Sequence, residues 1–213
     1  MNLYLIRHGQ TYLNKYDKMQ GWSDTPLTEE GIKVANDCAE KLKLVPFDAM
    51  YSSDLGRTIE TAAIIKNKNE FLRKKDLISL RAFRESFFGG FEGSPNGEAW
   101  GKIANSKGYT EVMEFFFHTP LHEIMNSMKA ADLFHDAESF DEFWERVSAG
   151  LTHVVEAGKE KQYENVLIVT HGNTIRNIVH KVDHTIDISE VKNSSITVMK
   201  WVENSFAISS FNG

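Results

Sequence analysis

Short apolar runs alternate with longer amphipathic stretches along the 213 residues of the chain. Leu3–Ile6 and Val166–Thr170 are apolar runs of the length typical of buried strands, and Asp48–Ser52 is expected to form a third strand. Two further segments near the end of the chain, Ile196–Val202 and Phe206–Phe211, are separated by Glu203-Asn204, a suitable turn. We therefore expect these last two segments to pair as a hairpin.

Apolar residues recur at helical spacing in three stretches between these strands. The first begins at Thr28, which can cap a helix, and its expected apolar face comprises Ile32, Ala35, Ala39 and Leu42. The second begins near Asp54, and its expected inward residues are Leu55, Ile59, Ala62 and Ala63. The third opens with the capping box Ser139–Glu142, and its expected inward residues are Phe143, Val147, Leu151 and Val154. Gly158 is its predicted end.

Strands that alternate with amphipathic helices indicate an α/β fold, with a mostly parallel central sheet and helices on both faces. Residues 94–138 have a different texture, because aromatic and methionine side chains are frequent there and Gly101, Gly108 and Pro120 interrupt the helical signals. We expect one domain over residues 1–213, in which residues 94–138 form an inserted helical lid over one end of the sheet. An ordinary packed helical subdomain is the alternative.

Composition narrows the class of protein. The chain has 24 Lys and Arg against 30 Asp and Glu, a net charge of −6, with 41% hydrophobic residues, as in a globular protein. The single cysteine, Cys38, excludes an internal disulfide and a cysteine-based metal site. The chain shows no signal peptide and no membrane span, so we expect a cytoplasmic protein without a membrane or nucleic-acid partner. Its acidic balance by itself also argues against an anionic substrate.

Polar residues follow three of the predicted strands. They are Arg7-His8-Gly9, then Ser52-Ser53-Asp54 with Arg57 close behind, and His171-Gly172-Asn173. Because ligands bind outside the carboxyl ends of parallel strands, these groups are expected to meet at one edge of the sheet. A neutral imidazole is a nucleophile when its other nitrogen is held as a donor, and an arginine fork grips phosphate oxygens in pairs. A purely structural role is the ordinary alternative for a single histidine at a strand end.

Five ordered blocks extend this pattern. They read Arg7-His8-Gly9-x-Thr11-x-x-Asn14, Gln20-Gly21-x-x-Asp24-x-Pro26-Leu27-Thr28-x-x-Gly31, Tyr51-Ser52-Ser53-Asp54-Leu55-x-Arg57-Thr58-x-x-Thr61-Ala62, Glu85-x-x-Phe88-Gly89-x-Phe91-Glu92-Gly93 and His171-Gly172-x-x-Ile175-Arg176. Together they resemble the histidine phosphatase superfamily, the phosphoglycerate-mutase-like enzymes, and within it the cytoplasmic branch of small phosphatases and mutases. The resemblance covers residues 1–93 and about 139–200.

The resemblance implies a role for each matching residue. His8 would be the nucleophile that becomes a phosphohistidine, and Glu85 the general acid and base. Arg7, Arg57 and His171 would surround the transferring phosphoryl group. Further phosphate or substrate contacts are expected from Asn14, Gln20, Gly21 and Gly172. Glu92, Asp24 and Arg176 match positions that we expect to be structural.

Two histidine pairs have the spacing of helical zinc ligands, but they do not support a metal site. His118 and His122 have a proline between them, and neither they nor His180 and His184 show the glutamate of a zinc-protease motif. Ordinary surface histidines are the expected interpretation. The phosphohistidine mechanism requires no metal, and no cofactor is predicted.

The resemblance leaves three functions open: a phosphomonoester hydrolase, a cofactor-dependent phosphoglycerate mutase, and a binding protein without catalysis. Residues 94–138 contain three lysines, no arginine and seven carboxylates, a net charge of −4, which disfavours a substrate with much additional negative charge. Hydrolysis of a small-molecule phosphomonoester is therefore expected. Side chains such as Trp100, Phe115–Phe117 and Met125 either bind an apolar leaving group or close the lid's own core. The oligomeric state is left open.

Overall fold

The computed structural model describes all 213 residues and contains one six-stranded sheet with the order β3-β2-β4-β1-β5-β6. The parallel strands are β1 (Asn2–Arg7), β2 (Ala49–Ser52), β3 (Leu77–Ser79) and β4 (Asn165–Thr170). The antiparallel strands are β5 (Ile196–Val202), which pairs with β1, and β6 (Ser205–Ser210). The predicted mostly parallel sheet and C-terminal hairpin are confirmed, whereas the short edge strand β3 was not predicted.

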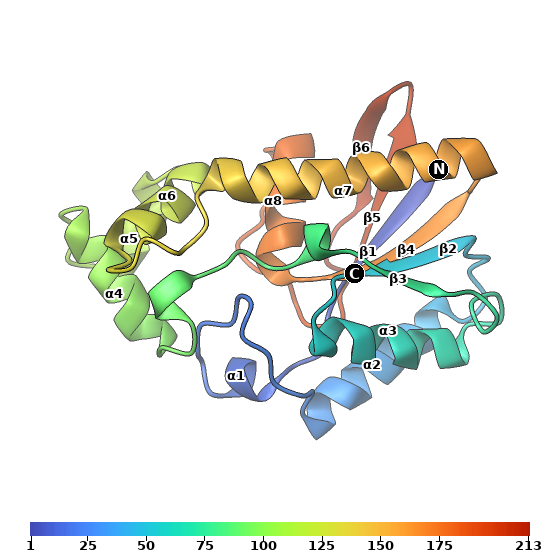
Figure 1. The fold of residues 1–213 in the computed structure, drawn as a ribbon, viewed down its shortest axis with the longest axis horizontal. Coiled ribbons are helices and arrows are strands. Elements are labelled where there is room, and N and C mark those ends of the chain that lie inside the picture. Colours follow the sequence, from blue (N-terminus) through green and yellow to red (C-terminus); the bar gives the residue numbers. More distant parts are fainter.

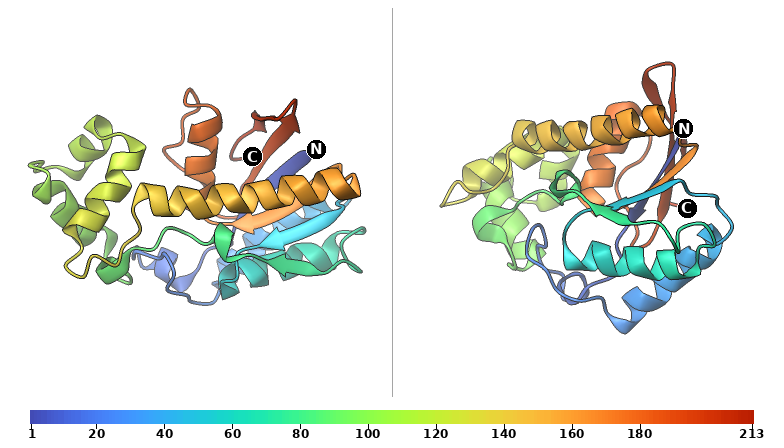
Figure 2. Two further views of the ribbon diagram at one scale, coloured as in Figure 1. Left: turned by 45° about the horizontal axis from the view of Figure 1, so that its top comes forward. Right: turned by 45° about the vertical axis from the view of Figure 1, so that its right-hand side comes forward.

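Helices cover both faces of this sheet, as predicted (Figures 1 and 2). The helices α7 (Phe140–Lys161) and α8 (Gly172–Val182) lie on one face. The helices α2 (Glu29–Leu42) and α3 (Gly56–Lys68) lie on the other. A one-turn helix α1 (Tyr12–Lys15) follows β1, and two short 3₁₀ helices, η1 (Arg81–Phe83) and η2 (Gly89–Phe91), lie between β3 and the next long helix. No helix has both the length and the apolar character needed to cross a membrane.

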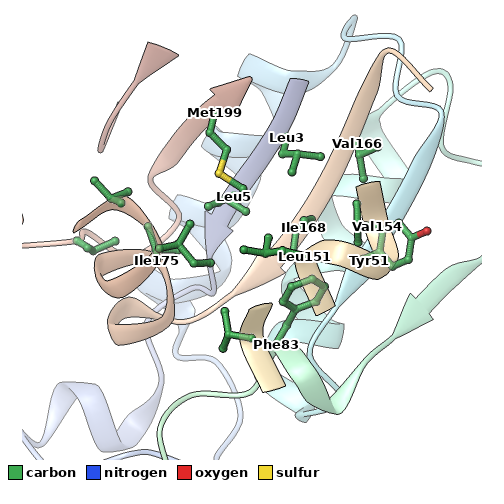
Figure 3. Packing of buried hydrophobic residues seen from close by; sticks show 14 of the residues in the cluster. Leu3, Leu5, Tyr51, Phe83, Leu151, Val154, Val166, Ile168, Ile175 and Met199 are labelled. Atoms are coloured by element: carbon green, nitrogen blue, oxygen red, sulfur yellow. The ribbon is translucent and has the colours of Figure 1, made fainter. Parts of the chain in front are cut away.

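The alternation of side chains along β4 divides the core into two layers. Val166 and Ile168 belong to the cluster beneath α7 and α8, which Figure 3 shows together with Leu3, Leu5 and Leu151. Leu167 and Val169 belong instead to the cluster beneath α2 and α3. Because every residue of β4 is buried, this central strand appears in the sequence as a continuous apolar run.

Some of the predicted helix faces are wrong. Ile32 and Ile59 are 39% and 38% exposed, and Ala63 is exposed as well. On α3 the buried face is instead partly polar, and it comprises Arg57, Thr58, Thr61, Ala62 and Ile65. A hydrophobic pattern cannot identify a face on which functional polar side chains are buried.

The predicted end of the third helix is also wrong, because α7 continues past Gly158 to Lys161. The helix ends at Gln162, which adopts the left-handed conformation at φ 57°. Gly158 has a packing role instead, since a Cβ atom there would lie 2.3 Å from the Met1 sulfur.

The insertion, residues 94–138, forms three helices beyond the end of the sheet: α4 (Asn96–Ser106), α5 (Val112–His118) and α6 (Leu121–Ala131). Their inward side chains form a third cluster around Phe115, together with Ile103, Ile124 and Met128. Met19, Phe88 and Phe91 from the loops below complete that cluster. The insertion therefore packs mainly on the loops at one end of the sheet.

Candidate active site

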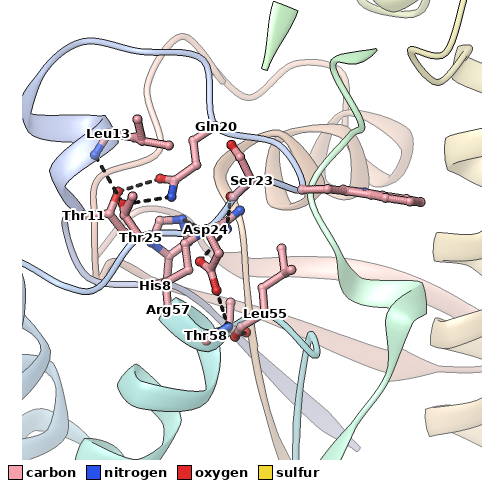
Figure 4. Close-up of polar contacts among 12 residues, drawn as sticks. His8, Thr11, Leu13, Gln20, Ser23, Asp24, Thr25, Leu55, Arg57 and Thr58 are labelled. Carbon is pink, nitrogen blue, oxygen red and sulfur yellow. Dashed lines mark hydrogen bonds and ion pairs between the residues drawn. The ribbon is translucent and has the colours of Figure 1, made fainter. Parts of the chain in front are cut away.

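The polar residues that follow β1, β2 and β4 meet at one edge of the sheet. The parallel pairing of β1 with β4 aligns Arg7 with Thr170, and the backbone N–H of His8 donates to the Thr170 carbonyl at 3.0 Å. The next residues along the two strands are therefore His8 and His171, whose ring centroids lie 5.2 Å apart. Arg57, in the first turn of α3, contacts both rings. Figure 4 shows His8 and Arg57 with the loop residues around them.

His8 is held in a single neutral form. Its Nδ1 lies 2.8 Å from the Gly9 carbonyl oxygen, and since a carbonyl can only accept, Nδ1 carries the hydrogen. The Nε2 atom is then unprotonated, and it accepts a hydrogen bond of 3.2 Å from Arg57 Nε. Burial, together with the charges of Arg57 and Arg7, lowers the pKa of His8 well below its ordinary value. The ring is thus neutral at neutral pH, and its Nε2 lone pair points toward Arg57.

Arg57 uses all five of its N–H donors. Besides His8 Nε2, it donates to His171 Nδ1 at 3.0 Å and to Asp24 Oδ1 at 3.0 Å. The remaining two bonds go to the Ser23 and Gly21 carbonyls, at 3.0 and 2.7 Å. Asp24 and the two carbonyls fix the guanidinium from one side, while the two donors on the histidines point into the site and could turn to an anion.

His171 is fully buried and is also fixed in one form. Because Arg57 donates to its Nδ1, the hydrogen lies on Nε2, which is 2.8 Å from Ser53 Oγ. Burial, and then the charge of Arg57, lowers the pKa of His171 well below its ordinary value. Ser53, the first residue after β2, therefore orients this ring.

Glu85 is buried, with 6% of its surface exposed, and this burial raises the pKa of its carboxyl group. Its Oε2 accepts the Asn173 N–H and its Oε1 the Ser86 N–H, each at 3.0 Å, and these bonds only partly offset the effect of burial. A carboxyl group with a raised pKa can hold and release a proton near the site of reaction. The Asn173 N–H belongs to the first turn of α8, so this helix positions the acid.

A cavity of about 380 Å³ opens beside these groups. The predicted site residues that line it are Arg7, Asn14, Gln20, Glu85 and Gly172. The insertion supplies one apolar wall, which comprises Trp100, Phe116, Leu121, Ile124, Met125 and Met128, and other segments add Met19, Phe87, Phe88, Ile188 and Val191. His8, Arg57 and His171 are buried and are not part of this lining.

Arg7 joins the cavity to the N-terminus of α8. Its guanidinium lies against Gly172, where a Cβ atom would come within 3.4 Å of Arg7 Nε. One terminal nitrogen donates to the Val191 carbonyl, whereas Nε is buried and has no partner. An unpaired arginine donor at the start of a helix favours binding of an anion there.

The other predicted contacts differ in where they lie. Asn14 and Gln20 line the cavity, and both also hydrogen-bond Thr11, at 3.3 and 2.5 Å. Gly21 does not line the cavity, and its N–H donates to Glu92 at 3.1 Å while its carbonyl accepts from Arg57. Gly21 supports Arg57 in this structure, and its contact with phosphate stays a prediction.

The three residues expected to be structural also differ: two hold neighbouring residues in place, and one lines the cavity. Glu92 accepts backbone hydrogen bonds from Gly21, Trp22, Ser23 and Phe88, so it fixes this loop. Asp24 holds Arg57. Arg176, in contrast, lines the cavity, so the expectation of a purely structural role is not supported.

Arg146, on α7, is a supporting residue that the sequence analysis missed. It donates to Glu138 at 2.7 Å through two nitrogens and to the carbonyls of Ala82, Arg84 and Glu85 at 2.7–3.0 Å. It therefore ties the segment that carries Glu85 to the end of the insertion. A lone arginine in a long amphipathic helix gives no sequence signal for such a role.

Neither histidine pair lies on one helical face. His118 ends α5 while His122 lies in α6, and His184 lies beyond the end of α8, which contains His180. His118 stacks on Tyr109, and His122 packs against Phe140. The four-residue spacing that suggested zinc ligands therefore does not correspond to a helical turn.

The chain is similar to known proteins over nearly its whole length. Residues 3–213 match the model of the histidine phosphatase superfamily (branch 1). A 2,3-bisphosphoglycerate-dependent phosphoglycerate mutase of Gloeobacter violaceus is 32% identical over 85% of this chain and 75% of its own. A metal-independent phosphoserine phosphatase of Arabidopsis thaliana is 28% identical, over 96% and 80%. The crystal structure of a Bacillus anthracis phosphoglycerate mutase superimposes with a TM-score of 0.95 at 32% identity, covering 100% of this chain and 92% of that one. With the paired histidines and Arg57 at the sheet edge, these matches show that the chain belongs to the histidine phosphatase superfamily.

Proposed function

We propose that the protein is a phosphomonoester hydrolase that works through a phosphohistidine on His8. The observation that carries this proposal is the unprotonated Nε2 of His8, fixed by the Gly9 carbonyl and flanked by Arg57. A neutral imidazole with a directed lone pair, next to an arginine and a helix N-terminus, suits attack on a phosphate dianion.

The proposed reaction has two steps. In the first, His8 Nε2 forms a bond to phosphorus as the ester P–O bond breaks, and the Glu85 carboxyl group gives its proton to the leaving oxygen. In the second, Glu85 takes a proton from water as the water oxygen attacks phosphorus, the P–N bond breaks, and inorganic phosphate leaves. Arg7, Arg57, His171 and the start of α8 balance the negative charge on the phosphoryl oxygens.

The apolar wall of the cavity favours a phosphatase over a mutase. The insertion contributes six apolar side chains, Asn96 and Glu138 to the cavity, and no lysine or arginine. A second phosphate, as in a bisphosphate cofactor, would find no cation on the insertion itself, and the cations that line the cavity besides Arg7 are Lys18 and Arg176. The −4 charge of the insertion is a weaker argument than the sequence suggested, because Glu138 alone of its seven carboxylates lines the cavity. The likeness to phosphoglycerate mutases keeps the mutase as the second candidate.

The test of the hydrolase is turnover of phenyl phosphate with trapping of the phosphoenzyme. The unaltered protein is expected to release phosphate and to form an acid-labile phosphoenzyme, and His8→Ala should do neither. His122→Asn, which alters an exposed histidine near the start of α6 and outside the cavity lining, is the matched control and should behave like the unaltered protein. Turnover that survives in His8→Ala would contradict the mechanism. Absence of turnover and of phosphoenzyme in the unaltered protein would favour the binding protein.

A second experiment separates hydrolase from mutase. The protein is incubated with 3-phosphoglycerate, with and without 2,3-bisphosphoglycerate, and inorganic phosphate and 2-phosphoglycerate are both measured. Release of phosphate independent of the bisphosphate supports the hydrolase. Bisphosphate-dependent formation of 2-phosphoglycerate at a higher rate than phosphate release would establish the mutase instead.

A further inference from the structure

A second cavity lies away from the candidate active site, between α7, α8 and the hairpin of β5 and β6 (Figure 1). Its volume is about 670 Å³, which is within the range of small-molecule sites. It shares no lining residue with the cavity beside Glu85, and the proposed reaction does not use it.

This second cavity is a groove that follows one face of α7. Its lining residues on that helix run from position 144 to position 159, a difference of 15, or about 22 Å of helix rise. Leu151 and Val155, which are 5% and 4% exposed, form the floor of the groove. Its sides are partly exposed aromatic residues, namely Trp144, Trp201 and Phe206. An apolar groove of this length that is open to solvent is typical of a binding site.

A lysine lies at each end of the groove. Lys181 Nζ is 5.6 Å from the centre of the Trp144 ring, and Lys159 Nζ is 5.2 Å from that of Trp201. Neither lysine forms an ion pair. Glu156, one turn before Lys159 on α7, is the only carboxylate of the lining. Lys181 is therefore the cation that is free to bind an anion, because a negative charge at the other end would meet Glu156.

The length and the charge of the groove favour a flexible apolar chain with one anionic end. The acyl chain of a lipid spans half of a bilayer's hydrocarbon core, about 15 Å, so such a chain and its carboxylate fit within the groove. A single planar ring would contact only one of the two tryptophans, since these lie at opposite ends. An amphipathic peptide helix with acidic residues at both ends would place one of them against Glu156.

We propose that the groove binds a long-chain carboxylate, with the carboxylate at Lys181 and the acyl chain running along α7 towards Trp201. The ligand class is that of a free fatty acid. Aromatic and aliphatic side chains of the groove pack against the methylene groups, and each buried methylene group strengthens binding about fourfold. This site goes beyond the proposed hydrolase and does not depend on it, because none of the proposed catalytic residues takes part.

Isothermal titration calorimetry with dodecanoate, below its critical micelle concentration, tests the site. Inorganic phosphate is present throughout to occupy the candidate active site. We expect one dodecanoate per chain. Decanoate, which has two fewer methylene groups, should bind about 10-fold more weakly. Decanol, which lacks the charge, should bind about 5-fold more weakly than decanoate.

Four variants locate the ligand in the groove. Lys181→Met should weaken dodecanoate about 5-fold and leave decanol unchanged, whereas Lys159→Met, the control at the other end, should change neither by more than about twofold. Thr152→Trp fills the groove from an exposed lining position and should abolish binding. Ala149→Trp, at an exposed position of the same helix outside the lining, should not. Circular dichroism melting shows whether each variant is folded.

Several results would overturn the proposal. Absence of dodecanoate binding to the unaltered protein would remove the site. Binding that phosphate abolishes and that survives in Thr152→Trp would place the ligand in the candidate active site instead. An equal loss of affinity in Lys159→Met and Lys181→Met would exclude the assigned orientation. A dimer in analytical ultracentrifugation that Thr152→Trp dissociates would show that a second copy of the chain covers the groove.

Discussion

At the scale of single residues, the candidate site shifts the pKa values of His8, the proposed nucleophile, and Glu85, the proposed acid, in opposite directions. Burial is the first cause of both shifts: it lowers the pKa of His8 and raises that of Glu85. Each residue is driven towards its neutral form, since a buried charge is costly. The same desolvation therefore favours the neutral forms that the proposed mechanism requires of both residues.

Glu85→Gln tests the role of the acid. The variant should lose activity on an alkyl phosphate such as glycerol 1-phosphate by about 100-fold to 10⁴-fold, the range of general acid catalysis. Its loss on p-nitrophenyl phosphate should be at least 10-fold smaller, because that leaving group needs little protonation. Equal losses on the two substrates, measured as phosphoenzyme formation in rapid quench, would exclude Glu85 as the acid.

The pH dependence follows from the same two shifts. Attack requires neutral His8, so activity should fall only when the pH drops below the lowered pKa of that ring. Protonation of the leaving group requires neutral Glu85, so the rate on an alkyl phosphate should fall as the pH rises through the raised pKa of its carboxyl group. A decline in rate on the alkaline side that belongs to Glu85 is therefore expected for alkyl phosphates.

Glu85→Gln supplies the control for the pH profile, because the ionisation of the substrate phosphate affects both proteins alike. The variant should lack the decline on the alkaline side that belongs to Glu85. An identical alkaline decline in the variant would assign it to the substrate or to another group.

The position of a site residue could be predicted from the sequence where the residue stands in a short motif at or just after the end of a predicted strand. Arg7, His8, Arg57 and His171 lie together at the sheet edge as expected. Arg176 could not be assigned to the cavity from its block, because a helical arginine gives no sign of whether its guanidinium is paired in the folded chain.

At the scale of elements, Arg146 joins three separate parts of the chain. Its bonds link α7 to the carbonyls before and at Glu85, and to Glu138 at the end of the insertion. Glu138 in turn accepts the Phe87 N–H at 2.9 Å. The segment on both sides of the acid is therefore held by one ion pair.

Arg146→Met should loosen this segment. We expect a loss of about 2–4 kcal/mol in the free energy of unfolding, because a carboxylate and three carbonyls lose their donor in a mostly buried place. The kcat on alkyl phosphates should fall more than on aryl phosphates, since misplacing Glu85 impairs the acid. Denaturant unfolding and steady-state kinetics measure the two effects.

Arg73→Met, at an exposed position, is the matched control for Arg146→Met and should change stability by less than about 0.5 kcal/mol. A loss of stability in Arg146→Met with the same fractional loss on both classes of ester would contradict a role in placing Glu85.

The hydrophobic pattern of the sequence sufficed to predict some helices and strands and not others. The all-buried strand β4 and the amphipathic α7 were predictable, because their buried faces are apolar. The buried face of α3 was not, because it carries Arg57 and two threonines that serve the site. The three-residue strand β3 is too short and too exposed to produce a pattern.

At the scale of the whole molecule, the insertion has an apolar cluster of its own. Phe115 lies at its centre, fully buried, while the two layers of the main core lie on either face of the sheet. Met125 joins α6 to the main core cluster, so the two regions are in contact. The sequence indicated helices here, but their packing depends on Met19, Phe88 and Phe91, which are distant along the chain.

Phe115→Ala should weaken the insertion before the rest of the fold. Removing a buried phenyl ring costs about 3–5 kcal/mol, and hydrogen exchange should accelerate in α4, α5 and α6 while β1 and β4 stay protected. Because these helices form one wall of the cavity, KM should rise.

Phe117→Ala, two residues further on and 85% exposed, is the control and should leave exchange unchanged. Uniform acceleration of exchange across the sheet in Phe115→Ala would show that insertion and sheet unfold as one unit.

The sheet edge and the insertion supply different kinds of side chain to the cavity, and this separation bears on how specificity could change under the proposed function. The groups proposed to carry out phosphoryl transfer come from strand ends and from α3 and α8, whereas the insertion supplies mainly apolar side chains to the cavity. Substitutions at the six apolar residues of the insertion can therefore change which leaving groups fit the cavity while the proposed catalytic residues stay the same. A library randomised at these positions and screened on a panel of phosphate esters should contain variants with new specificities that keep their hydrolytic activity.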